Sequence, residues 1–99
     1  MIDLATATRE TFVPHLGSQF SISLADGELA LELFAADALP TGAHALRAPF
    51  SLRFRSTVTT GYLPQQIYTL SHPALGSLEI FLVPLGADAN GMRYEAVFG

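Results

Sequence analysis

Three histidines are the residues of this sequence best suited to metal binding, and their spacing decides whether they can do it. His15 follows a proline, His44 lies in a stretch without regular periodicity, and His72 precedes a proline. None has a second histidine two or four residues away, the spacing that aims two imidazoles at one ion. The chain also has no cysteine, so it offers no thiolate ligand and no disulfide. We predict no metal site, unless the fold brings the imidazoles together.

Nucleophilic catalysis needs a nucleophile or a base beside a side chain that orients it. Ser71 and His72 are neighbours on a predicted strand, so their side chains point to opposite faces and form no dyad. Asp88 lies in a polar segment, residues 86–91, where an Asx turn is its expected role. The sequence has neither a glycine-rich phosphate-binding motif nor a lysine. We therefore predict no catalytic residue, no cofactor and no enzymatic activity.

Charged side chains occupy alternate positions in two predicted strands. Ser51, Arg53 and Arg55 share one face of a strand, and Glu28 and Glu32 share one face of another. Opposite charges that face each other across a sheet contribute about 0.2–1 kcal/mol per pair. Pairing within the chain is the favoured interpretation, because the acidic stripe is already present in it. The alternative is that the arginines bind an acidic partner.

Hydrophobic side chains that recur at every second residue predict β-strands, because successive side chains of a strand point to opposite faces. Six segments have this pattern: 20–25, 28–34, 50–55, 66–72, 78–83 and 92–98. Asp26 and Gly27, between the first two segments, predict a tight hairpin, since glycine accepts the positive φ of such a turn. The fifth segment is apolar on both faces from Ile80, which is typical of a central strand.

A short helix is predicted near residues 8–12, ahead of the first strand. Thr6 or Thr8 is suited to cap this helix, and Pro14 ends it. Phe12 and Leu16 are four residues apart and are expected to close one end of the β core together. These elements predict a single domain over residues 1–99. It is mostly β, either a small antiparallel barrel or a two-layer sandwich of about six strands, with one short N-terminal helix.

Charge and hydropathy each argue against one class of partner. Five arginines stand against nine acidic residues, for a net charge of −4. Proteins that bind nucleic acids need clustered cations to neutralise phosphates, so we predict no nucleic-acid partner. The sequence begins without a basic region, and no apolar run approaches the roughly 18 residues that span a bilayer. We predict no membrane partner and a cytoplasmic location.

Apolar side chains are unusually frequent. Charged residues make up 14% of the chain, against about 25% in typical soluble domains. The apolar fraction is 49%, or about 57% with the eight glycines, against the usual 45–50% counted in that way. Alanines in loops would account for part of this excess. We favour the interpretation that an exposed apolar patch is covered by another protein surface.

The predicted interface lies in three places: the aperiodic segment 36–49, expected to be a long functional loop, the third strand, and the loop that follows it. Its candidate residues are Leu39, His44, Leu46, Arg53, Arg55, Tyr62 and Leu63. The favoured function is a non-enzymatic structural or interaction module that self-associates or docks on a larger assembly. The alternative is a small-molecule or glycan-binding barrel with Tyr62, Tyr68 and Tyr94 at its mouth, because tyrosine joins an apolar body to a polar tip.

Several segments of the chain resemble one known family. The most specific is the final run Gly91-Met92-Arg93-Tyr94-Glu95-Ala96-Val97-Phe98, and the similarity extends over residues 50–84 and 12–20. On these motifs the chain resembles a family of small bacterial domains of unknown function. The resemblance implies an association with phage-tail-like, tail-collar proteins, and hence an accessory or assembly role. It supplies no catalytic residue.

Overall fold

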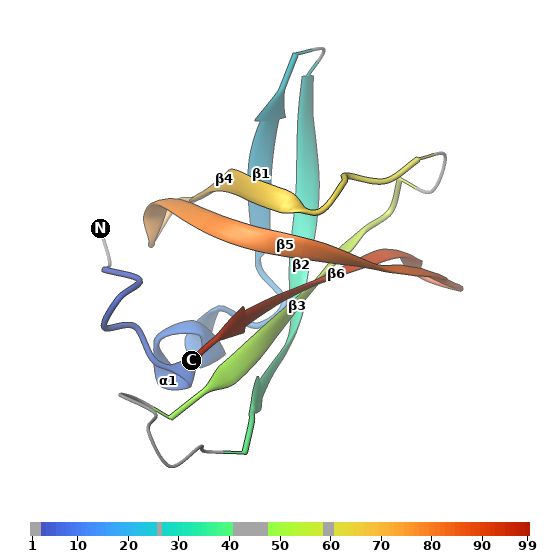
Figure 1. Cartoon of the computed structure of the whole chain (residues 1–99). Coiled ribbons are helices and arrows are strands. Elements are labelled where there is room, and N and C mark those ends of the chain that lie inside the picture. Colours follow the sequence, from blue (N-terminus) through green and yellow to red (C-terminus); the bar gives the residue numbers. More distant parts are fainter. Residues whose placement is uncertain (1–2, 26, 41–47, 59–60) are drawn as a thin grey trace.

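Six antiparallel strands close into a barrel in the computed structural model of the chain (Figure 1). The structure describes residues 3–25, 27–40, 48–58 and 61–99. The strands are β1 (Gln19–Leu24), β2 (Gly27–Ala38), β3 (Phe50–Ser56), β4 (Gln66–His72), β5 (Gly76–Asp88) and β6 (Gly91–Phe98). Their order around the barrel is β1-β2-β3-β6-β5-β4. The predicted mostly β architecture is confirmed, and of its two predicted forms the structure has the barrel.

The alternating pattern directs one face of each strand into the barrel. Phe20, Leu31, Phe54, Leu70 and Leu82 come from five different strands and expose no surface. Burial of one such side chain contributes about 1.5–3 kcal/mol to stability. The middle of the barrel is therefore a packed core of phenylalanine and leucine.

A short helix covers one end of this core, as the sequence predicts. It comprises α1 (Arg9–Phe12) and the 3-10 turn η1 (Val13–His15). The Phe12 ring is fully buried, with its centroid 6.0 Å from that of Phe50. Leu16, in contrast, is 43% exposed. The expectation that it closes the core together with Phe12 is wrong, because the 3-10 turn interrupts the helical spacing of these two residues.

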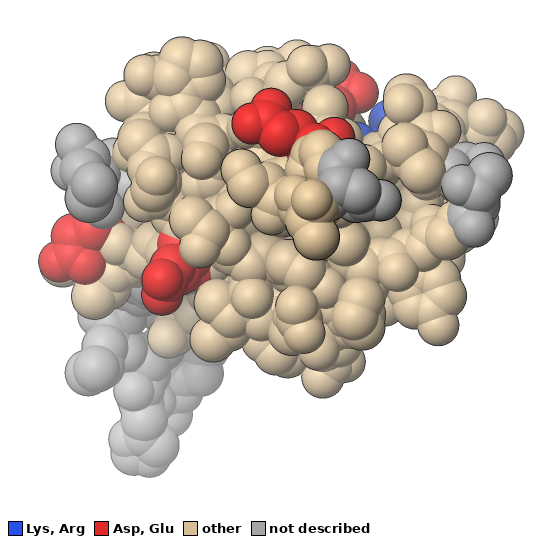
Figure 2. Space-filling view, turned by 90° about the horizontal axis from the view of Figure 1, so that it is seen from above, with Lys and Arg blue, Asp and Glu red and all other residues tan. Residues whose placement is uncertain are grey.

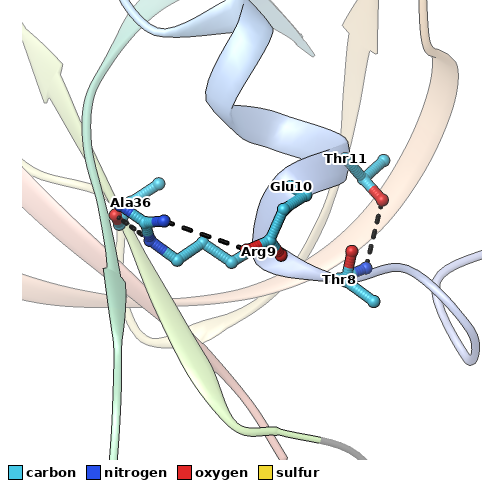
Figure 3. A network of polar contacts seen from close by, with 5 residues as sticks. All are labelled: Thr8, Arg9, Glu10, Thr11 and Ala36. Atoms are coloured by element: carbon cyan, nitrogen blue, oxygen red, sulfur yellow. Dashed lines mark hydrogen bonds and ion pairs between the residues drawn. The ribbon is translucent and has the colours of Figure 1, made fainter.

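Two polar contacts hold the helix in place (Figure 3). The Thr8 backbone N–H donates to Thr11 Oγ1 at 3.1 Å at the start of α1. The Arg9 side chain crosses to β2, where Nε donates to the carbonyl of Ala36 at 2.8 Å. Arg9 also lies 4.0 Å from the Glu10 carboxylate. The helix is thus tied to the barrel by a hydrogen bond to the strand as well as by Phe12.

Two strands are longer than predicted, because β-bulges interrupt their alternation. β2 continues to Ala38, and its register shifts between Leu33 and Ala35. β5 continues to Asp88, with a shift between Pro84 and Gly86. A bulge adds one residue and exchanges the faces of the strand beyond it. Residues 36–38 and 86–88 therefore belong to strands, and not to the predicted loops.

Two further expectations concern the hairpin and the fifth strand. β1 and β2 form the predicted hairpin, but Gly27, whose φ is +144°, pairs with Leu24 as the first residue of β2 and does not belong to the turn; Asp26 lies outside the described residues. Phe81, on the outer face of β5, is 48% exposed. The prediction of a central strand with two buried faces is wrong, since a closed barrel buries only its inner face. No helix in the described ranges has the length and apolarity needed to cross a membrane.

The seam between β1 and β4 is the weakest closure of the barrel. These strands share only the pairs Ser21↔Ser71 and Ile22↔Leu70. Each of the other neighbouring pairs of strands shares five or more paired positions. Beyond the seam the β1–β2 hairpin rises away from β4 (Figure 1).

Candidate functional site

An apolar cleft opens at the end of the barrel opposite α1. Its volume is about 170 Å³. The residues that line it come from β1, β2, β3, β6 and the segment before β4: Leu24, Leu29, Ser56, Val58, Gly61, Tyr62, Leu63 and Tyr94. Tyr62 is 65% exposed and Val58 is 50% exposed, whereas Tyr94 is buried. The cleft therefore has a buried floor and an exposed apolar rim.

Two tyrosine hydroxyls fix the segment that carries the rim. Tyr94 Oη accepts a hydrogen bond from the Leu63 backbone N–H at 2.9 Å, and Tyr68 Oη donates to the Pro64 carbonyl at 2.6 Å. Burial, and secondarily the neighbouring Tyr94, raises the pKa of Tyr68 above its usual value. Both hydroxyls thus hold the backbone of this segment, Tyr68 with its O–H and Tyr94 with an oxygen lone pair, so that Tyr94 keeps its own O–H as a donor.

A second hollow, of about 370 Å³, lies on the other side of Tyr62. Its lining is Tyr62, Pro84, Leu85, Gly86 and Met92. Among the residues that the structure describes, no charged side chain lines either hollow. We call the exposed side chains Leu24, Val58, Tyr62 and Leu85 the apolar rim. Figure 2 shows one face of the molecule, on which few charged side chains interrupt the uncharged surface.

The charged residues gather instead on the outer face of β3 and β6. Arg53 Nε lies 3.4 Å from the Glu95 carboxylate. Arg55 and Arg93 face each other in the ladder, and both contact Asp88 Oδ2, at 3.5 and 3.6 Å. The pairing of Arg53 and Arg55 within the chain is thus observed, but with acids of β5 and β6 in place of the expected Glu28 and Glu32. Glu32 lies opposite Arg55 in the ladder, and Glu28 lies opposite Ser23.

Asp88 also forms the predicted Asx turn. Its Oδ1 accepts the Asn90 backbone N–H at 2.8 Å. This hydrogen bond is the main reason why the pKa of Asp88 is lowered; desolvation opposes it, and the charges of Arg55 and Arg93 add to the lowering. The Asp88 carboxylate thus closes the β5–β6 turn and also contacts the two like-charged arginines.

The fold brings His72 and His15 together, with ring centroids 4.9 Å apart. His72 is buried, and its Nδ1 accepts the backbone N–H groups of Ala74 at 3.0 Å and Leu75 at 3.3 Å. The proton of the neutral imidazole is therefore assigned to Nε2, which lies 3.0 Å from Ser18 Oγ. In this tautomer His72 donates to Ser18 and cannot accept its proton. The pair thus has a structural role.

The environment of His72 disfavours its charged form. Burial, and secondarily the nearby His15, lowers the pKa of His72 below the usual value. No group of three or more His, Cys, Asp or Glu side chains able to hold a metal occurs within the described ranges. His44 lies outside these ranges.

Of the predicted interface residues, the structure brings only Tyr62 and Leu63 together, in the cleft. Leu39 is half-buried beyond β2, where its N–H donates to the Pro49 carbonyl at 2.9 Å. Arg53 and Arg55 lie on the outer face of β3. His44 and Leu46 lie outside the described residues. Sequence reasoning missed Leu24, Leu29 and Val58, which reach the cleft only through the barrel topology.

Comparison with known proteins identifies the family but no characterised relative. No curated protein and no solved structure matches the chain. The family described as Domain of unknown function (DUF6916) matches residues 7–98. This range includes all six strands, α1 and every residue of the cleft. The chain therefore belongs to the DUF6916 family.

Proposed function

We propose that this domain is a non-enzymatic protein-interaction module whose partner inserts one apolar side chain into the cleft beside Tyr62. The volume of the cleft carries the proposal. Apolar cavities of about 150 Å³ hold a molecule the size of benzene, whereas drug-sized ligands occupy about 300–1,000 Å³. At about 170 Å³ the cleft matches a single leucine or phenylalanine side chain.

The chemistry of the cleft favours a side chain over a sugar. A glycan site needs free polar groups that fix the orientation of hydroxyls. The hydroxyls of Tyr68 and Tyr94 are engaged by the backbone of residues 63–64, and Ser56 Oγ accepts the Val58 N–H at 3.1 Å. These contacts make the small-molecule or glycan-binding barrel the weaker hypothesis.

The apolar rim supports the same proposal. Tyrosine is enriched among the residues that contribute most to protein interfaces, and these residues sit in apolar surroundings. Tyr62 is the most exposed member of the rim, and the described residues that line the hollows on both of its sides are uncharged. The partner is either a second copy of the chain or a component of a larger assembly. The resemblance to domains associated with tail-collar proteins makes a phage-tail-like assembly the first candidate, and the sequence makes the cytoplasm the expected compartment.

Site-specific photo-cross-linking tests the proposal. We would place p-benzoylphenylalanine at position 62 and, in a control, at position 97, where Val97 is 63% exposed on the outside of β6. In the producing cells, we expect a discrete protein adduct from position 62 only. A mass of twice 10.6 kDa would indicate self-association. No adduct, or equal adducts from both positions, would contradict the proposal.

A further inference from the structure

The open part of the β1–β4 seam indicates what kind of segment the partner presents. β4 is paired with β5 over its whole length, from Gln66 to His72. On the other side, its pairing with β1 stops at Leu70. Residues 66–69 therefore have a neighbouring strand on one side only, within the part of the chain that the structure describes. An edge of this kind is a template for an added strand.

The direction of the peptide groups follows from the ladder. Leu33 N–H donates to the Ser18 carbonyl at 3.1 Å, so even-numbered residues of β1 hydrogen-bond toward β2 and odd-numbered residues toward β4. Ser21, which lies opposite Ser71, therefore directs its N–H and C=O toward β4. By the same alternation, the N–H and C=O of Ile67 point into the open seam. No strand among the described residues pairs with them there.

The seam and the cleft share one residue, at the end of β1. Leu24 is the last residue of β1 and also lines the cleft. Inward-facing side chains of β4, such as Tyr68 and Leu70, are buried, whereas Ile67 and Thr69 point outward and are exposed. A strand added along β4 would therefore direct alternate side chains inward, toward Leu24 and the cleft.

We propose that the partner contributes a short extended segment that pairs with the edge of β4 at residues 66–69 and points one apolar side chain into the cleft. The inference rests on the proposed function and specifies its partner. Backbone hydrogen bonds to Ile67 hold the segment, and the cleft selects an apolar residue, as in other cases of strand addition. Because the described lining of both hollows is uncharged, we expect the segment to be uncharged where it lies in the site.

The first test is a selection of random decapeptides displayed on phage. The protein serves as bait, with two variants as matched controls. Ile67→Ala removes the side chain but keeps the backbone N–H, whereas Ile67→Pro also removes the N–H. We expect enriched peptides with alternating apolar residues that bind the wild type and Ile67→Ala but lose binding to Ile67→Pro by about tenfold or more. A library that yields no such peptide overturns the inference.

The second test keeps the inference falsifiable if Ile67→Pro does not fold. We would synthesise one selected peptide and measure exchange of the Ile67 amide proton by NMR. We expect exchange to slow by roughly tenfold or more in the complex, and N-methylation of alternate peptide amides to abolish binding. Binding that is lost in Tyr62→Ser but is insensitive to N-methylation would overturn strand pairing and leave the proposed function standing. The cross-linking experiment at position 62 tests the proposed function separately.

Discussion

At Gly91, the addition of a single methyl group is predicted to destabilise the protein strongly. This glycine begins β6, pairs with Asp88 and has a φ of +138°, which residues with a side chain rarely adopt. A Cβ atom at this position would lie 2.0 Å from the carbonyl oxygen of Ser56 and 2.9 Å from its carbonyl carbon. Since both atoms are backbone, Gly91→Ala forces the end of β3 to move.

Gly86 supplies a matched control for the magnitude. Its φ is +105°, but a Cβ atom there would meet nothing within 4 Å. Both alanine variants bear the cost of an unfavourable backbone conformation, about 1–3 kcal/mol. Only Gly91→Ala adds a clash, which in a packed site costs about 1–3 kcal/mol more. A difference of about 2 kcal/mol corresponds to about 8–16 °C in Tm for a domain of this size.

Urea and thermal unfolding, followed by far-ultraviolet circular dichroism, would measure this difference. We expect Gly91→Ala to unfold at a lower urea concentration and a lower temperature than Gly86→Ala. Equal stability of the two variants would refute the close approach of β6 to β3 on which the reasoning depends.

Three further perturbations test separate parts of the structure. Burial, and secondarily His15, lowers the folded-state pKa of His72, so the unfolded state binds the proton first. The urea midpoint of the wild type should fall as pH drops below about 6.5, and His72→Gln should weaken this dependence of the midpoint on pH. The same pH dependence in both proteins would contradict a lowered pKa of His72. Asp88→Asn should destabilise the protein, because Arg55 and Arg93 then face each other without the carboxylate between them. Salt screens this repulsion, so 1 M NaCl should restore part of the lost stability. A loss of stability that does not depend on salt would contradict the role of Asp88. Phe12→Ala should cost about 3–5 kcal/mol in urea unfolding and the exposed Leu16→Ala about 0.5 kcal/mol or less; similar costs would contradict the different burial of these two residues.

The sequence predicts most of the barrel, because its strands keep one buried face. Phe20 and Ile22, or Phe50, Leu52 and Phe54, alternate without interruption and lie in the core. The pattern misleads where a bulge inserts a residue, as it does after Leu33, and in β5, where the apolar Phe81 lies on the outer face. Local patterns therefore give the strands but not their full lengths.

The candidate site was only partly predictable. Tyr62 and Leu63 could be predicted, because apolar residues in a loop indicate a contact surface. Leu24 and Leu29 read as ordinary strand positions, and only the spread of the β1–β2 hairpin from β4 exposes them to the cleft. Ser18 and His72 are 54 residues apart in the sequence, so no spacing indicates their contact. Such sites depend on long-range topology.

An NMR titration of the cleft with N-acetyl-leucinamide tests the central claim most directly. This compound presents one leucine side chain between two amides, and maltose serves as the comparison. We predict saturable chemical-shift changes in Leu24, Leu29 and Leu63 with N-acetyl-leucinamide, lost in Tyr62→Ser, and none with maltose. Changes with maltose alone, or none at these leucines with either compound, would contradict the claim that the cleft receives an apolar side chain.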